Sequence, residues 1–261
     1  MATGFFVSGR GDLDVLFAPR VSAAVANTGF RSNGGVDLAQ RFEPRGATAA
    51  IANTNFKAGA NDLAQLFKAF GVFAPVIRTY DTPVVGATET VPAGATSVTI
   101  KVWGAGGGGG LFTGPPGGGG GGGGYAERTL SVTGGQTFTY SVGAGGIGLQ
   151  GPGNGSGASG GNSNVVSVSP AFTQACNGAA PGQQATGGAG GTVSNTGGSV
   201  STTGGNGAAT VTGGSSPNGG GQQTTSGGAG NVPGGGGAGH LNSGSNKAGN
   251  GSNARVQFSY T

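Results

Sequence analysis

The feature that most constrains this chain is the concentration of glycine in its second part. Of the 65 glycines among 261 residues, only eleven precede Gly104, and the other 54 lie in residues 104–261. About one residue in three is the glycine content of a collagen-like chain, but no strict Gly-X-Y period runs through this segment. Because glycine loses much backbone freedom on folding and brings no side chain to bury, a conventional hydrophobic core cannot form there.

Strand-like segments flank the glycine runs. Polar and apolar residues alternate in residues 97–103, 125–132, 136–143 and 254–261, which is typical of half-buried strands. Gly134-Gly135 is a tight-turn signal between the second and third of these segments. We expect the last strand to return, after more than 100 residues, to complete a sheet begun before the insert. The expected core consists of Val98, Ile100, Val102, Leu130, Val132, Phe138, Tyr140, Val142, Val256 and Phe258.

The glycine-rich insert allows two interpretations. Its runs of glycine are separated by spacers rich in Ser, Thr, Asn and Gln, as in a flexible linker. The alternative is a bundle of polyproline-II-like strands with three residues per turn, in which glycine lets neighbouring backbones hydrogen-bond to one another. We favour the ordered bundle, because a linker would not separate paired strands of one sheet.

The first 71 residues contain three copies of a 25-residue unit. The positions that hold in every copy and that we assign to a docking surface are Asp12, Leu13, Phe17, Asp37, Leu38, Phe42, Asp62, Leu63 and Phe67. In each copy the Asp is a candidate N-cap, and the Leu and Phe that follow share one helical face. Such short helices are marginal alone, so the Leu-Phe pairs must pack on neighbouring units or on a larger assembly. We favour docking onto an assembly.

Charge and chemistry exclude several functional classes. All eight acidic residues precede residue 128, and only Lys247 and Arg255 carry positive charge beyond Arg128, so no basic stripe predicts nucleic-acid binding. Cys176 and His240 are single residues of their type, which predicts no intrachain disulfide, no metal site and no cofactor. We expect Cys176 to be a small buried residue, and we expect no enzymatic activity.

The sequence also carries no signal for a membrane or for export. No apolar run approaches the ~20 residues of a transmembrane helix, so membrane insertion is not expected. The first ten residues lack a basic segment followed by an apolar one, so no signal peptide is visible. We therefore expect synthesis in a host cytoplasm without export and, for the reasons given next, localisation in a virion.

Four segments, taken in order, resemble a known family. They are Val98-Thr-Ile-Lys-Val-Trp-Gly-Ala-Gly-Gly, Gly-Gly-Tyr125-Ala-Glu, Gly135-Gln-Thr-Phe-Thr-Tyr-Ser-Val-Gly-Ala-Gly-Gly and Ala254-Arg-Val-Gln-Phe-Ser-Tyr. Residues 90–261 look like the glycine-rich domain at the ends of bacteriophage tail-fibre proteins. The insert also resembles the polyglycine-II sandwich of the detachable adhesins of T-even-like phages. The N-terminal attachment domain of those adhesins is not recognisable here, where the 25-residue repeat stands instead.

The resemblance implies that the glycine stretches and the loops of the insert have different roles. Its rigid core would consist of the glycine stretches 104–110, 117–124, 143–148, 187–191, 219–221 and 234–239. The loops between them would contact a bacterial surface protein or glycan, although these spacers contain few aromatic residues. The candidate receptor-contact residues are Leu111, Phe112, Val168, Phe172, His240 and Leu241. Residues 165–168 could equally form one more strand.

The expected fold is therefore mostly β, in three parts. Residues 1–71 are a docking module of repeats with short helices, residues 72–96 are a linker, and residues 97–261 are a small antiparallel sheet framing a polyproline-II-type bundle. The expected function is that of a structural virion protein that docks onto other virion proteins or copies of itself. The alternatives are a self-assembling extracellular filament or a capsid decoration protein. An ice-binding protein is less favoured, because regular Thr or Ala ranks are not visible.

Overall fold

The computed structural model describes residues 57–58, 61–62, 73–151, 153–195, 200–240 and 247–261. The chain divides into two compact units, Met1–Ala69 and Phe70–Thr261. In the first unit, the described residues form two short antiparallel strands, β1 (Lys57–Ala58) and β2 (Asn61–Asp62). In the register of this hairpin, the backbone of Asp62 lies opposite that of Lys57. The short helices predicted for the repeats lie outside the described residues.

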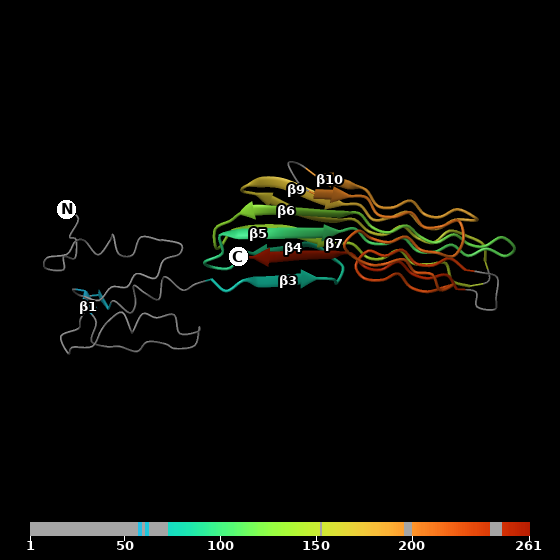
Figure 1. The fold of residues 1–261 in the computed structure, drawn as a ribbon, viewed down its shortest axis with the longest axis horizontal. Helices are drawn as coiled ribbons and strands as arrows, with labels where there is room; N and C mark the ends of the chain where they lie inside the picture. The colour runs from blue at the N-terminus through green and yellow to red at the C-terminus, as the bar shows by residue number, and fades with distance from the viewer. Residues whose placement is uncertain (1–56, 59–60, 63–72, 152, 196–199, 241–246) are drawn as a thin grey trace, which may run out of the picture. The chain divides into compact units, whose positions relative to one another are not determined.

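The second unit is mostly β, and its described residues include no helix (Figure 1). Its strands are β3 (Val76–Tyr80), β4 (Val84–Thr90), β5 (Ser97–Trp103), β6 (Tyr125–Ser131), β7 (Thr137–Val142), β8 (Ser163–Val168), β9 (Ala171–Cys176), β10 (Val193–Asn195), β11 (Val200–Thr202) and β12 (Arg255–Tyr260). The four strands predicted from alternation are β5, β6, β7 and β12, and all four are confirmed.

These strands form two antiparallel five-stranded sheets. One has the order β11-β6-β5-β12-β3 and the other β10-β9-β8-β7-β4. The last strand, β12, lies between β5 and β3, with Phe258 opposite Ile100 and Arg78. The predicted return of the C-terminal strand to a sheet begun before the insert is therefore confirmed.

The structure differs from the sequence expectation at two places in this frame. The turn at Gly134-Gly135 does not pair β6 with β7, because it leads from one sheet into the other; the amide of Gly135 donates to the Val91 carbonyl. Residues 72–96 are not a linker, because they contribute β3 and β4 to opposite sheets. Both strands are edge strands with weak sequence alternation, and the expected single sheet is in fact a sandwich.

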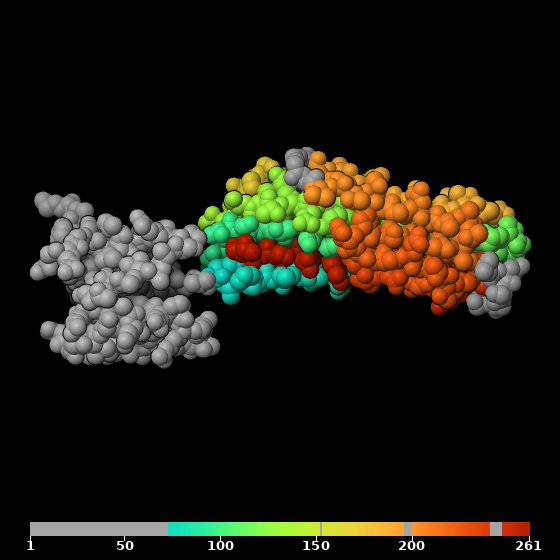
Figure 2. Space-filling model, in the orientation of Figure 1, coloured from blue at the N-terminus to red at the C-terminus, as the bar shows by residue number. Residues whose placement is uncertain are grey.

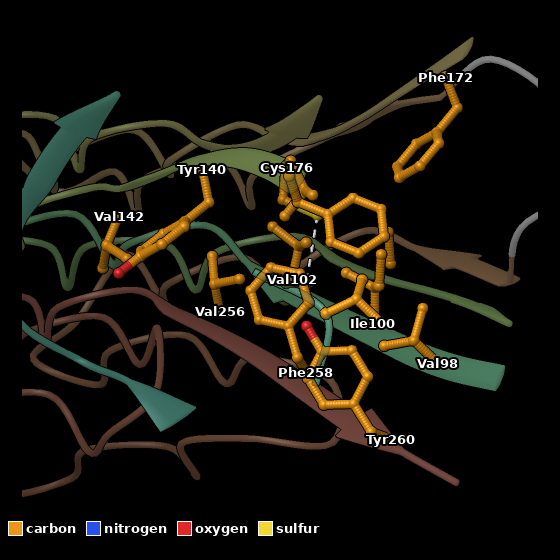
Figure 3. Packing of buried hydrophobic residues seen from close by; sticks show 14 of the residues in the cluster. Val98, Ile100, Val102, Tyr140, Val142, Phe172, Cys176, Val256, Phe258 and Tyr260 are labelled. Atoms are coloured by element: carbon orange, nitrogen blue, oxygen red, sulfur yellow. Dashed lines mark hydrogen bonds between the residues drawn. The ribbon is translucent and has the colours of Figure 1, made fainter. Parts of the chain in front are cut away.

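Side chains from both sheets fill the space between them (Figure 3). Phe258 on β12 packs against Phe138 and Tyr140 on β7, with ring centroids 5.6 and 6.0 Å apart. The predicted core residues are buried, apart from Leu130, which is partly buried against the cluster. The sequence reading missed Val91, Val165, Phe172 and Tyr260, which are also buried in this core.

Beyond the sandwich, residues 104–111 are hydrogen-bonded through the backbone with a period of three. The amides of Gly104, Gly107 and Gly110 donate to the 118–124 segment, and those of Ala105, Gly108 and Leu111 donate to residues 155–161. Gly106 and Gly109 donate to residues 249–252. Carbonyls of the same segment accept from residues 146–149, 179–182 and 237–240. Among the described residues, this segment is therefore bonded to six neighbouring segments.

Three segments occupy the interior of this bundle. Every residue of 104–111, 117–124 and 234–240 is buried, and nearly all of them are glycine. A Cβ added at Gly120 would lie 2.1 Å from the Gly107 carbonyl oxygen, and one at Gly107 would lie 2.1 Å from the Ala180 oxygen. The close approach of the backbones thus excludes side chains at these positions, and it places the longest glycine runs at the centre.

The surrounding segments follow a different rule. In residues 143–150, 186–192 and 203–209, every third residue is exposed and carries a side chain, as at positions 186, 189 and 192, and most of the residues between them are glycine. Asparagine side chains close some hydrogen bonds at this periphery. The Asn250 Oδ1 accepts from the Gly148 amide at 2.9 Å, and the Asn253 Oδ1 accepts from the Gly145 amide at 3.0 Å.

Candidate functional site: the turns at the end of the glycine bundle

Several turns between bundle segments lie together at the end of the bundle that is remote from the sheets (Figures 1 and 2). Three consecutive amides after the first turn show this proximity: Gly117 donates to His240, Gly118 to Gln183, and Gly119 to Ala208 and Thr210. We call this group of turns the distal turns, and its described members are 112–116, 150–151 with 153–154, 183–186, 209–211 and 222–226. It is the candidate functional site of the chain.

The turn at residues 112–116 is held by its neighbours. It connects the two interior glycine segments, and Gly114 adopts a φ of 109°, which side chains rarely allow. The Thr113 amide and hydroxyl both donate to the Asn154 Oδ1, at 2.5 and 2.9 Å. On the other side, the Ala185 amide donates to the Pro116 carbonyl at 3.1 Å. Loops fixed in this way on a rigid scaffold are the usual location of recognition surfaces.

The structure places the predicted contact residues in different environments. Phe112 lies in the first of the distal turns and is half-buried, whereas Val168 is 90% exposed but belongs to β8 in the sandwich. The side chains of Leu111, Phe172 and His240 are buried, so the expectation that they are exposed is wrong. Leu241 lies outside the described residues. Receptor contact itself stays a prediction for the exposed positions.

Each of the three buried candidates has a structural explanation. Phe172 on β9 faces the core, 6.0 Å from the Phe138 ring, and Arg128 lies over its ring at 4.9 Å. Leu111 pairs with Gly155 in an isolated bridge at the end of an interior segment. His240 ends another interior segment, where its amide donates to Gly110. The alternative interpretation of residues 165–168 as one more strand is confirmed, since they belong to β8.

Sequence reasoning missed the polar residues of the distal turns. Thr113, Asn154 and Gln184 are exposed there, and the turn signals Thr-Gly-Pro-Pro and Asn-Gly mark two of the loops in the sequence. These residues are polar, whereas most of the predicted contact residues are apolar. The sequence does not show which loops lie at the same end of the bundle, so it does not group these residues into one site.

The described sandwich contains a buried carboxylate, Glu89, whose oxygens are both paired within the sandwich. Glu89 on β4 is 2% exposed and accepts hydrogen bonds from Arg78, Tyr80 and Tyr260 of the opposite sheet, at 2.7, 2.6 and 2.9 Å. Burial, followed by the hydrogen bond to Glu89, raises the pKa of Tyr260 above its ordinary value. Because Glu89 and its three partners lie on different sheets, this cluster joins the two sheets. Each Glu89 oxygen already has a partner within the cluster.

The single cysteine is buried as predicted. The Cys176 Sγ donates to the Val102 carbonyl at 3.2 Å, a contact between the two sheets (Figure 3). Burial raises the pKa of its thiol to about 12, far from that of a reactive thiolate. Among the described residues, no group of three or more His, Cys, Asp and Glu side chains is placed to hold a metal ion.

The described part of the chain also contains no helix long and apolar enough to cross a membrane.

Comparison with known proteins identifies the class of the second unit. The family model of the glycine-rich domain matches residues 82–261, which include nine strands of the sandwich and the whole bundle. The chain belongs to this glycine-rich domain family. The match covers β4 and begins before the first strand predicted from the sequence, in agreement with the correction at residues 72–96. No curated protein matches the chain.

Proposed function

We propose that this chain is a structural virion protein of a bacteriophage, of the tail-fibre or adhesin type, with a binding and not a catalytic role. In this proposal, the N-terminal repeats attach the chain to other virion proteins or to copies of itself. The glycine-rich domain then presents its distal turns to a bacterial surface. The observation that carries the proposal is the collection of the turns at one end of a hydrogen-bonded bundle.

The bundle is suited to hold such turns in place. Its hydrogen-bond partners rotate with a period of three along residues 104–111, as expected if the segments are polyglycine-II-type helices. Each interior segment is bonded on all sides, so its ends have little freedom. Loops that are fixed before binding lose less conformational entropy when a partner binds, which favours affinity.

The attachment role rests on the repeat. Its Leu-Phe pairs recur every 25 residues, and the short helices predicted from the sequence would need a surface on which to pack. Replacement of Leu38 and Phe42 by Ala should therefore reduce incorporation of the chain into particles and leave the glycine-rich unit folded. Normal incorporation of the stable double variant would contradict the docking role.

Electron microscopy of purified particles tests the proposal as a whole. Gold-labelled antibody against the glycine-rich unit should mark a fibre, baseplate or capsid surface, and excess purified chain should compete with particles for adsorption to host cells. The absence of the chain from every particle would contradict the proposal.

A further inference from the structure

We propose that the distal turns recognise a neutral oligosaccharide. This inference rests on the proposed function and names the chemical class of its receptor. It depends on three properties of the turns: their lack of charge, the kind of polar group that they expose, and the small apolar surface at the first turn.

Charge is almost absent from the bundle. Residues 104–124 and 129–246 contain no Asp, Glu, Lys or Arg. The one charged residue of the bundle segments is Lys247, which is exposed and whose backbone pairs with Gln150 of the distal turns, so the site has a single lysine beside it. The ion pairs of the described chain join sandwich residues, such as Arg255 with Asp81 and Arg78 with Glu89. A partner at the distal turns is therefore held without a set of ion pairs. This disfavours acidic glycans, phosphate groups and charged protein surfaces, for which clustered Lys or Arg would be expected.

The polar groups exposed on the turns are amides and hydroxyls. They include those of Thr113, Asn154, Gln183, Gln184, Thr210 and Thr224. An amide or hydroxyl side chain offers both donors and acceptors, and so does each hydroxyl group of a sugar. Asn154 illustrates how this capacity is oriented. Its Oδ1 accepts two bonds from Thr113, which fixes the side chain, while its Nδ2 donates to nothing in the described chain.

The first turn adds a small apolar surface. Phe112 is half-buried, because the edge of its ring lies against Gly110; its Cε2 atom is 3.2 Å from the position that a Cβ on Gly110 would occupy. Pro115 in the same turn is exposed. The face of an aromatic ring is electron-rich and attracts positively polarised edges, such as the C–H groups on one side of a sugar ring. A protein partner of ordinary interface size would instead require several aromatic, Met or Arg anchors, and the described distal turns supply one aromatic.

A binding experiment with the full chain tests the inference. The probes are an array of neutral and acidic bacterial oligosaccharides, and host cells treated either with periodate, which cleaves sugar diols, or with protease. We expect binding to neutral glycans, loss of cell binding after periodate, and retention after protease. The Phe112→Ala variant should weaken glycan binding roughly tenfold or more, and Gln184→Ala by a smaller factor. Thr203→Ala, an exposed change on the flank of the bundle, should bind as the parent chain does.

The possible failures are distinguishable. Cell binding that survives periodate and disappears after protease would overturn the glycan inference and leave the adhesin function standing. Binding to acidic glycans alone, or equal binding by all three variants, would also overturn it. If the folded chain bound neither cells nor glycans, the proposed function would fail together with the inference.

Discussion

The β-sandwich is held together by side chains, whereas the adjoining glycine bundle is held together by its backbone. In the sandwich, Phe258, Phe138 and Tyr140 fill the space between two sheets. In the bundle, Gly107 and Gly120 lie where a single added carbon would overlap a neighbouring carbonyl. One region therefore depends on burying apolar surface, and the other on hydrogen bonds between closely spaced backbones.

The difference teaches that the two regions respond to opposite changes. The sandwich loses stability when atoms are removed from it, and the bundle loses stability when atoms are added. Cys176 and the tyrosines paired with Glu89, whose pKa values are raised by burial, lie in the sandwich.

Removal of a large side chain from the sandwich should have the largest effect. Phe258→Ala deletes a ring that is fully buried between the sheets, which should cost about 3–5 kcal/mol of unfolding free energy. Denaturant titration followed by the fluorescence of Trp103 measures it. Phe258→Leu serves as the control with a smaller loss, and a cost below about 1 kcal/mol for the Ala variant would show that the core is not packed as described.

Addition of one carbon to the bundle interior should come next. In Gly120→Ala the new Cβ would lie 2.1 Å from the Gly107 oxygen, so the backbones must separate, at a cost of roughly 1–3 kcal/mol or more. The matched control is Gly221→Ala, where nothing lies within 4 Å and the change should stay within about 0.5 kcal/mol. Equal stability of the two variants, measured by thermal unfolding, would contradict a close-packed interior.

Alkaline pH should destabilise the sandwich. Burial raises the pKa of the Cys176 thiol from 9.0 to about 12, and it also raises the pKa of Tyr80 and Tyr260. Above pH 9 the unfolded chain loses this proton and the folded chain keeps it, so stability falls as pH rises toward 12, by about 2 kcal/mol from the thiol at about pH 10.5.

The control for this pH dependence is the Cys176→Ala variant. Without the thiol, the decline in unfolding free energy between pH 9 and 10 should be shallower, and the remaining decline at higher pH should come from the tyrosines. Denaturant midpoints at a series of pH values provide the measurement. Parallel curves for the two proteins would mean that the thiol ionises as readily in the folded chain as in the unfolded one.

The smallest effect is expected at the periphery of the bundle. Asn250→Ala removes the acceptor of the Gly148 amide, which should cost about 1 kcal/mol and accelerate exchange of that amide. Asn250→Asp keeps an acceptor oxygen and should exchange more slowly than the Ala variant. If Ala and Asp variants exchange alike, the side chain does not hold the peripheral segment.

The sequence predicted the sandwich strands better than their arrangement. Alternation marks β5 and β12 because each buries one face only, as at Val98, Ile100 and Val256. The turn at Gly134-Gly135 carries no signal that distinguishes a hairpin from a crossing between sheets. The edge strands β3 and β4 are partly exposed on both faces, so alternation in them is weak.

The bundle contains a signal that the overall composition hides. A strict three-residue period is absent from the insert as a whole, because interior segments need glycine at nearly every position. The outer segments do follow it: Thr186, Ala189 and Thr192 are exposed in one rank, so the expectation that no regular Thr or Ala rank exists is wrong for this segment. At the candidate site, the apolar residues of the sequence did not identify the exposed positions. Phe172 is buried in the core of the sandwich. Asn154 and Gln184 lie at the same end of the bundle because the hydrogen bonds between its segments place their turns there.

Amide hydrogen exchange across the second unit tests most directly whether the glycine segments form an ordered core. The amides of Gly107, Gly120 and Gly237 each donate to another segment in the bundle interior. They should therefore exchange as slowly as the amides of β5 and β12 in the sandwich. Exchange of these amides, and of residues 143–253 in general, at the rates of an unfolded chain would contradict this account, since the insert would then be a linker.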